Sequence, residues 1–212
     1  MIKTIIFDFD GVIANTDEGR YKLLKDILPT YGLDFAISDY NKMIGLSTKS
    51  FLKRNYSELT EKEINLIVSE RHKLYFENLD RYCIPFNGMT DIVEKFSHYF
   101  QLIVATTNAT ENVIKQMDFL NISQYFNYVF GREVMENTFL LKDYQNLASR
   151  PEFNVKESIV IEDSETGILS AKKSGYACIE FNSKEKTKNE NSDYCVNNYY
   201  DLYNLVLKLK LE

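Results

Sequence analysis

The sequence is poor in several features that would mark particular classes of protein. It contains only three cysteines, and their wide spacing fits neither a disulfide framework nor a set of metal ligands. Its apolar runs are too short to span a bilayer, and its first residues lack the charged, apolar and small-residue regions of a secretory signal. We therefore expect a cytoplasmic protein with no membrane partner.

The chain also lacks an excess of positive charge. Its 25 Lys and Arg residues against 31 Asp and Glu residues give a formal net charge of −6. An electrostatic nucleic-acid binder needs a basic surface, so this balance argues against a nucleic-acid partner. It does not exclude a phosphorylated substrate, because a bound divalent cation and one lysine can reverse the potential locally.

What the sequence does contain is an alternation of short apolar segments and helical patterns. Strands are expected at residues 3–7, 101–106, 128–130, 158–161, 176–181 and 194–196. Helices are expected at residues 89–99, 111–120, 139–149, 165–174 and 200–209. This alternation predicts an α/β fold with a doubly wound, Rossmann-like parallel sheet.

The segment between the first two strands has helical patterns only. Apolar residues recur at helical spacing over residues 18–30, and Thr60 followed by Glu63 resembles a capping box that opens a helix reaching about Leu79. We predict a core of residues 1–14 and 84–212, interrupted by an α-helical cap of residues 15–83. Because ligands bind beyond the carboxyl ends of the strands in open α/β sheets, such an insert would cover the site as a lid.

Acidic side chains follow two of the expected strands. Asp8 and Asp10 come directly after the first strand, and Glu162 and Asp163 follow the strand at residues 158–161. Like charges held this close are unfavourable unless a cation binds them, and carboxylate and carbonyl oxygens suit Mg²⁺. Capping of the next helix by Asp163 or Ser164 is the alternative for the second pair.

A hydroxyl and a lysine belong to the same pattern. Thr106 and Thr107 end the strand that begins near residue 101, where a hydroxyl and backbone N–H groups can hold phosphate oxygens. Lys142 lies between two further strands and is a natural point charge for phosphate. Taken alone, each residue has an ordinary explanation, as a strand former or a solvated lysine, so the combination carries the argument.

The combination resembles the haloacid dehalogenase-like hydrolase superfamily, whose members are mostly phosphatases. The motifs Asp8–Val12 and Ile161–Ile168 carry the resemblance, which covers nearly the whole chain. Together with Ala171–Gly175, they look like the branch that includes β-phosphoglucomutase and phosphoglycolate phosphatase. The presence of Asp10 argues against dehalogenases and phosphonate hydrolases of that superfamily.

The resemblance implies a role for each catalytic residue. Asp8 attacks phosphorus and becomes an aspartyl phosphate, while Asp10 protonates the leaving oxygen and later deprotonates water. Thr106 and the Thr107 amide bind the phosphoryl group, and Lys142 neutralises it. The hydroxyl that binds phosphate is alternatively Thr107, with Asn108 as its neighbour.

The resemblance also implies Mg²⁺ as the cofactor. Its ligands are expected to be Asp8, the Asp10 backbone carbonyl and Asp163, with Glu162 reaching the ion directly or through water. Two positions depart from the family pattern: Asn15 stands where an acid is usual, and Lys142 is not followed by the usual Pro-x-Pro. Lys156 is the only nearby alternative lysine, and it lies too close to the next strand.

The substrate is expected to be a small phosphorylated metabolite. Arg20 and the segment around Gly45, with Lys49 beyond it, are candidates for contact with an anionic substrate, although a solvated helix face explains them as well. The chain does not reproduce the His and Arg of true mutases, so hydrolysis is favoured over a phosphosugar mutase reaction. A monomer and a homodimer are both compatible with the sequence.

A different class, a phospho-accepting receiver module that only binds partners, also uses Asp, Thr and Lys on a parallel sheet. Its acidic pair is usually adjacent, its phospho-acceptor lies on a later strand, and it has no helical insert. The Asp8-x-Asp10 spacing and the second acidic pair therefore favour an enzyme.

Overall fold

The chain forms two compact units. The computed structural model describes residues 1–43, 46–136, 142–184 and 187–211. The core unit comprises Met1–Asn15 and Pro85–Glu212, and the helical unit comprises Thr16–Ile84. The chain thus leaves the core unit once, shortly after its first strand. No helix in the described ranges is both long and apolar enough to cross a membrane.

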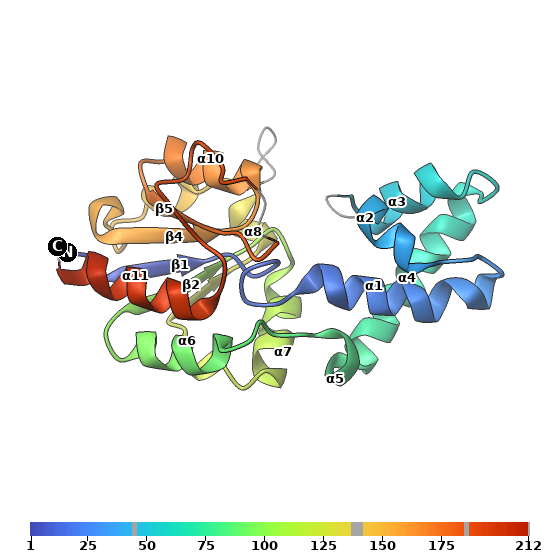
Figure 1. Cartoon of the computed structure of the whole chain (residues 1–212), viewed down its shortest axis with the longest axis horizontal. Coiled ribbons are helices and arrows are strands. Elements are labelled where there is room, and N and C mark those ends of the chain that lie inside the picture. Colours follow the sequence, from blue (N-terminus) through green and yellow to red (C-terminus); the bar gives the residue numbers. More distant parts are fainter. Residues whose placement is uncertain (44–45, 137–141, 185–186, 212) are drawn as a thin grey trace. The chain divides into compact units, whose positions relative to one another are not determined.

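The core unit is built on a six-stranded parallel sheet (Figure 1). Its strands lie in the order β3-β2-β1-β4-β5-β6, and every pairing is parallel. The strands are β1 (Thr4–Phe7), β2 (Gln101–Ala105), β3 (Tyr128–Phe130), β4 (Ser158–Glu162), β5 (Ala177–Phe181) and β6 (Tyr194–Val196). The prediction of a doubly wound α/β core is therefore confirmed, with all six strands where the apolar segments indicated.

Helices cover both faces of the sheet because successive strand residues point to opposite faces. Ile5 and Phe7 of β1 pack in one apolar cluster, whereas Ile6 packs in the other. The first cluster is closed by α6 (Met89–Ser97), α7 (Thr110–Phe119) and α11 (Tyr199–Leu211). The second is closed by α8 (Arg132–Met135), α9 (Gln145–Ala148) and α10 (Glu165–Lys173). Near-continuous apolar strands are what burial on both faces requires.

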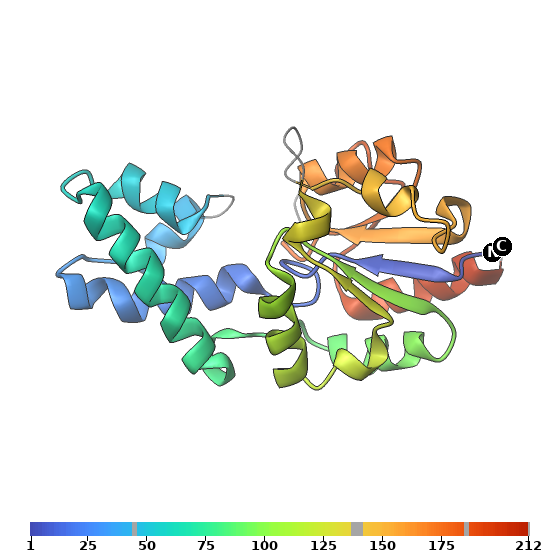
Figure 2. The same ribbon diagram turned by 180° about the vertical axis from the view of Figure 1, so that it is seen from behind.

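The sheet topology places three strand ends side by side. β1 lies between β2 and β4, and Phe7 is in register with Val104 and with Ile161. The strand order changes direction between β1 and β4. The residues that follow these two strands therefore lie at the position where open α/β sheets bind ligands. Both termini lie at the opposite end of this unit (Figure 2).

The helical unit has its own apolar core. Its elements are α1 (Thr16–Ile27), two 3₁₀ turns (Leu28–Tyr31 and Ile37–Asp39), α2 (Tyr40–Met43), α3 (Thr48–Asn55), α4 (Glu61–Glu77) and α5 (Leu79–Tyr82). The predicted capping box is present: Thr60 Oγ1 accepts from the Glu63 amide, and Glu63 accepts from the Thr60 amide at 2.8 Å. The described residues of this unit contain no strand, as the patterns indicated.

Two predicted helices have different bounds. The first ends at Ile27, because Pro29 continues the chain as a 3₁₀ turn that Gly32 closes in the left-handed region. Of the helix expected over residues 139–149, residues 139–141 lie outside the described part. The remainder is helical only as α9, from Gln145, whose amide donates to Asp143 Oδ1.

Candidate active site

The first acidic motif forms a tight turn at the end of β1. Asp8 continues the sheet, because its amide donates to the Ile161 carbonyl at 2.9 Å. The chain then reverses, and the amides of Ile13 and Ala14 both donate to the Phe9 carbonyl. Gly11 has φ +81°, and a Cβ there would lie 2.1 Å from Asp163 Oδ2. Glycine is therefore required both by the turn and by the close approach of the second acidic motif.

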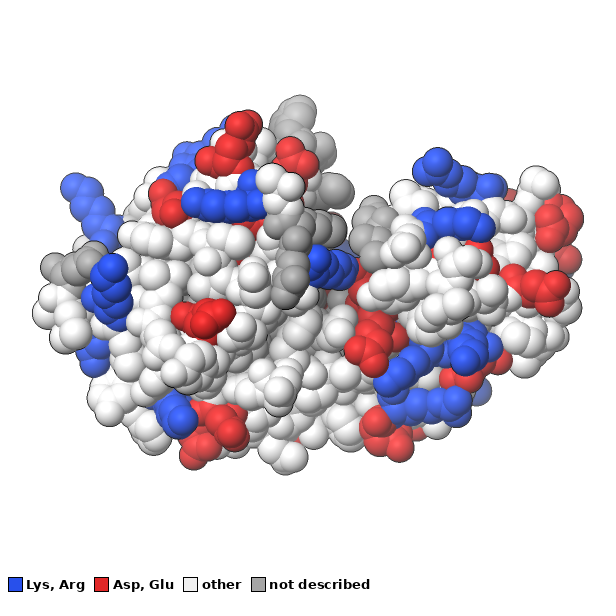
Figure 3. Space-filling view, in the orientation of Figure 1, with Lys and Arg blue, Asp and Glu red and all other residues white. Residues whose placement is uncertain are grey.

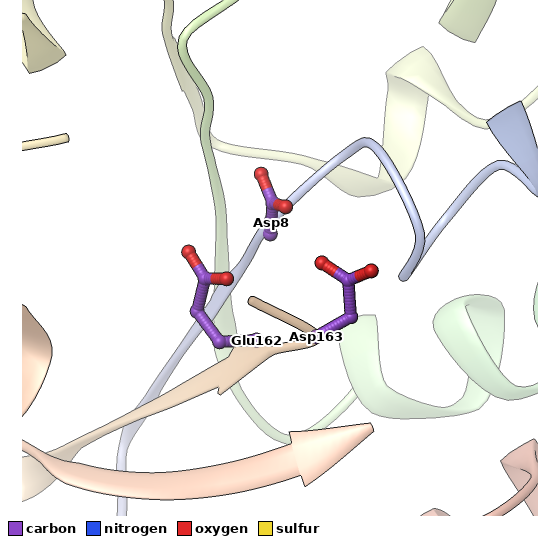
Figure 4. Close-up of side chains that lie close together, drawn as sticks. All are labelled: Asp8, Glu162 and Asp163. Carbon is purple, nitrogen blue, oxygen red and sulfur yellow. The ribbon is translucent and has the colours of Figure 1, made fainter. Parts of the chain in front are cut away.

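The second acidic motif lies beside Asp8, at the end of β4. Ligand atoms of Asp8, Glu162 and Asp163 all fall within 4.8 Å of one another. Figure 4 shows the three carboxyl groups converging from the two neighbouring segments. Ser164 is the N-cap of α10, with its Oγ accepting from the Gly167 amide at 3.1 Å, so helix capping does not need Asp163.

Lys142 is the buried cation of this cluster. Its side chain is 6% exposed, and its Nζ lies 2.6 Å from both Asp8 Oδ1 and Glu162 Oε1. The sequence could not show this contact, because 134 positions separate Lys142 from Asp8. Burial alone would lower the pKa of Lys142, but Asp8 and Glu162 outweigh burial and raise it. Lys142 is therefore protonated at neutral pH.

One lysine does not balance the cluster. Burial raises the pKa of Asp8 well above its usual range; Lys142 lowers it, and the charges of Glu162 and Asp163 raise it again. Among the described residues, three clustered carboxyl groups have one buried ammonium group beside them, which leaves room for further positive charge. Since all the donors are carboxylate oxygens and Mg²⁺ takes oxygen ligands, the residues present fit a bound Mg²⁺ ion.

Thr106 begins a turn at the end of β2, next to β1. It is fully buried, and its amide donates to the Phe130 carbonyl at 2.9 Å. Its Oγ1 accepts from the Asn108 amide at 3.1 Å, while Asn108 Oδ1 accepts from the Ala109 amide at 2.9 Å. These contacts fix residues 106–109 as a turn leading into α7, as the strand-to-helix pattern predicted.

Two residues that the sequence analysis did not single out hold this turn in place. Arg132 donates from its amide to the Asn108 carbonyl at 2.8 Å, and from Nε to the Thr107 carbonyl at 3.1 Å. Glu133 accepts from the Thr110 hydroxyl at 2.6 Å, at the start of α7. Both lie in α8, directly after β3. In the sequence, only their position just after a strand indicated that they could lie near the site.

Tyr144 is a further residue that the sequence analysis passed over. It is fully buried, and its hydroxyl donates to Glu162 Oε1 at 2.9 Å. Burial raises the pKa of Tyr144 well above its usual range, so the hydroxyl keeps its proton and acts as a donor. The signal available was its place two residues after Lys142, at the variable position of the Lys-Pro-x-Pro pattern.

The candidate residues of the helical unit make contacts within that unit. Arg20 donates to Asp17 Oδ1 at 2.9 Å, to the Met43 carbonyl at 2.7 Å and to the Leu46 carbonyl. Gly45 lies outside the described residues. Lys49 lies 2.6 Å from Glu61 and is 43% exposed. Arg20 therefore links α1 by hydrogen bonds to Met43 and Leu46.

Comparison with known proteins supplies independent evidence. The family model described as haloacid dehalogenase-like hydrolase matches residues 5–181, well over half of the chain. A phosphoglycolate phosphatase from Aquifex aeolicus is 26% identical over 181 residues, which cover 82% of each chain. A phosphorylated carbohydrates phosphatase from Thermotoga maritima is 22% identical over 179 residues, again covering 82% of each chain.

Solved structures agree with this result at the level of the fold. The HAD-hydrolase YfnB from Bacillus subtilis, solved bound to magnesium, superposes with a TM-score of 0.73 at 16% identity. The match covers 97% of this chain and 98% of that one. The parallel sheet and its flanking helices are thus those of a known hydrolase fold.

Proposed function

Because the chain belongs to the haloacid dehalogenase-like hydrolases, we propose that it is a Mg²⁺-dependent phosphatase that hydrolyses a small phosphorylated metabolite through an aspartyl phosphate on Asp8. One observation carries this proposal. Asp8 is nine-tenths buried at the end of β1, paired with the buried Lys142 and converging with Glu162 and Asp163. A solvated acidic loop would have neither the burial nor the shared cation.

The proposed reaction has two steps. A carboxylate oxygen of Asp8 attacks phosphorus, and the bond from phosphorus to the leaving oxygen breaks as Asp10 donates a proton to that oxygen. Water then attacks phosphorus and gives a proton to Asp10, the bond from phosphorus to Asp8 breaks, and inorganic phosphate leaves. Covalent catalysis of this kind splits one difficult displacement into two easier ones.

The residues around Asp8 supply charge and orientation. Lys142, already held at Asp8 Oδ1, would neutralise the transferring phosphoryl group. Thr106 Oγ1 accepts from the Asn108 amide, so its own hydrogen can be donated to a phosphoryl oxygen. The Thr107 amide lies on the same turn, and we assign it to a second phosphoryl oxygen. The Asn108 amide is already donated to Thr106 Oγ1, so Asn108 supports the phosphate site by orienting that hydroxyl.

The converging carboxylates are proposed to hold Mg²⁺. Asp8, Asp163 and the Asp10 backbone carbonyl would bind the ion, with Glu162 beside it. When bound, Mg²⁺ supplies positive charge to the phosphoryl oxygens and offsets the repulsion between the acids.

The helical unit is proposed to be the cap that selects the substrate. It is inserted between Asn15 and Pro85, and a bridge between Ala14 and Pro85 joins its two connections a few residues from Asp10. Arg20 and Gly45 remain our candidates for substrate recognition, and Arg20 donates to the carbonyl groups of Met43 and Leu46. A cytoplasmic location and a monomeric or homodimeric state complete the proposal.

The test is phosphate release from purified protein, first with p-nitrophenyl phosphate and then with a panel of phosphorylated metabolites. We expect turnover with Mg²⁺, none with EDTA, and a loss of more than about 10⁴-fold in Asp8→Asn. Activity in a clean preparation of that variant would contradict the assignment of Asp8. Isomerisation of a sugar phosphate that depends on a bisphosphate and releases no phosphate would favour the mutase alternative.

A further inference from the structure

Tyr144 is held at both ends within the core unit. Its hydroxyl donates to Glu162 Oε1 at 2.9 Å, and its amide donates to Ser170 Oγ at 3.2 Å. Its ring packs in the apolar cluster on the α10 face of the sheet, and Lys142 Nζ lies 5.3 Å from the ring centroid. A single tyrosine thus contacts both members of the Lys142–Glu162 ion pair.

The carboxylate of Glu162 is surrounded by protein donors. Oε1 accepts from Lys142 Nζ and from the Tyr144 hydroxyl, while Oε2 accepts from the amide of Ser164 at 3.3 Å and from its Oγ at 3.0 Å. A carboxylate offers about four lone-pair sites, and four donors occupy them. Glu162 is therefore fixed in one orientation, facing Lys142.

Lys142 needs such an anchor. An ammonium group is a point charge on a flexible four-carbon stem, and it has no planar geometry of its own to orient it. Glu162 Oε1 is its second carboxylate contact beside Asp8, and the Tyr144 hydroxyl in turn fixes Glu162. Without that hydroxyl, Glu162 loses one of the two donors that set the position of Oε1.

From these contacts we propose that Tyr144 is a positioning residue, which orients Glu162 so that Lys142 stays at Asp8 and receives the phosphoryl group. The inference rests on the proposed function and assigns part of it to a residue that touches neither substrate nor metal. Because protein donors occupy all four acceptor sites of Glu162, the ion is left to Asp8, Asp163 and the Asp10 carbonyl. We therefore expect weaker binding of phosphate and of the transition state, with Mg²⁺ binding left intact.

The chain provides a matched control. Tyr176 is also fully buried in the same cluster, with its ring centroid 6.2 Å from that of Tyr144. Within the described residues, its hydroxyl has no hydrogen-bond partner. Tyr144→Phe and Tyr176→Phe therefore remove the same atom from the same apolar cluster, and only the first removes a bond to Glu162.

The experiment measures both variants in three ways. In Tyr144→Phe we expect kcat/KM to fall about tenfold, the usual scale for one hydrogen bond to a charged group. By calorimetry, the affinity for inorganic phosphate in saturating Mg²⁺ should fall by a similar factor, and the affinity for Mg²⁺ alone should change less than about threefold. Tyr176→Phe should stay within about twofold of the wild type throughout.

A second comparison separates positioning from a general effect on folding. In a Lys142→Met background, Tyr144→Phe should cause no further loss of phosphate affinity, because the two changes act through one group. Equal losses in Tyr144→Phe and Tyr176→Phe, parallel losses of Mg²⁺ and phosphate affinity, or additive losses in the double variant would each overturn the inference. A wild-type protein that neither binds nor releases phosphate would instead overturn the proposed function.

Discussion

Two groups of three charges, one in each unit, have nearly the same geometry. In the core unit, Lys142 lies 2.6 Å from Asp8 and 2.6 Å from Glu162. In the helical unit, Glu61 lies 2.6 Å from Lys49 and 2.7 Å from Lys53. The core side chains are at most 10% exposed, whereas those of the helical group are 43–54% exposed. Burial, and not distance, distinguishes them.

The difference has energetic consequences. Exposed ion pairs are screened by water and salt and contribute little to stability. In a buried group, removing one partner leaves an uncompensated charge, so each member depends on the others. On the face shown in Figure 3, acidic and basic side chains alternate over the helical unit. The core group is therefore a mutually dependent buried cluster, as the proposed function requires, and the helical group belongs to a solvated surface.

The largest predicted contrast comes from removing one lysine from each group. Lys142→Met should reduce kcat/KM by about 10³-fold, because the phosphoryl group loses its neutralising charge. It should also lower the free energy of unfolding in the absence of Mg²⁺ by about 3 kcal/mol, because Asp8 and Glu162 remain buried without their cation. Lys49→Met should change neither quantity measurably. Urea unfolding and steady-state kinetics on both variants test this contrast, which equal effects would contradict.

The next contrast compares two glycines. A Cβ at Gly167 would lie 2.2 Å from the Glu162 carboxyl carbon, so Gly167→Ala must displace that carboxylate. A shift of about 1 Å in catalytic geometry costs about 10²-fold, and we expect a loss of that size in kcat/KM.

Gly32 is the matched position in the helical unit. Its Cβ would meet no atom within 4 Å, but its φ of +71° disfavours alanine. Gly32→Ala should therefore cost about 1 kcal/mol of stability while activity is retained. Circular dichroism melts and kinetics measured together distinguish the two results. Full activity in folded Gly167→Ala would show that Glu162 need not keep its place.

The smallest contrast concerns two helix N-caps. Ser164 caps α10 and also donates to Glu162 Oε2 at 3.0 Å. Thr60 caps α4, and within the described residues its side chain bonds only with Glu63. Replacing either residue with alanine should cost about 1 kcal/mol of stability. Only Ser164→Ala should also lower kcat/KM, by about tenfold, because it removes a bond to a charged group of the site. Similar activities in the two variants would mean that Ser164 serves the helix alone.

The sequence was most informative where candidate site residues directly follow a strand. Acids that directly follow apolar strands had to meet at one edge of a parallel sheet, and Asp8 and Asp163 do so. Lys142 was a candidate from its place between two strands, and the family resemblance gave it a role. Its meeting with Asp8 depends on a chain path that no local pattern encodes, so the structure was needed to show the contact.

Residues that act through others were not predictable. Tyr144 supports Glu162, and Arg132 supports the Thr107–Asn108 turn. A buried tyrosine or a surface arginine has no distinctive sequence pattern that would predict such a contact. In the helical unit, the sequence predicted the helices and the Thr60 capping box. It could not show that Arg20 donates to the Met43 and Leu46 carbonyl groups, because 23 and 26 positions separate these residues from Arg20.

The most direct test of the account is to detect phosphate on Asp8. p-Nitrophenolate leaves without a proton, so Asp10→Asn should still transfer the phosphoryl group but should lack the base that activates water. We predict a burst of p-nitrophenolate equal to the amount of enzyme, and acid quenching followed by mass spectrometry should place one phosphoryl group on Asp8. If the wild type hydrolyses this substrate with Mg²⁺ but the variant gives no burst and no modified Asp8, the account is contradicted.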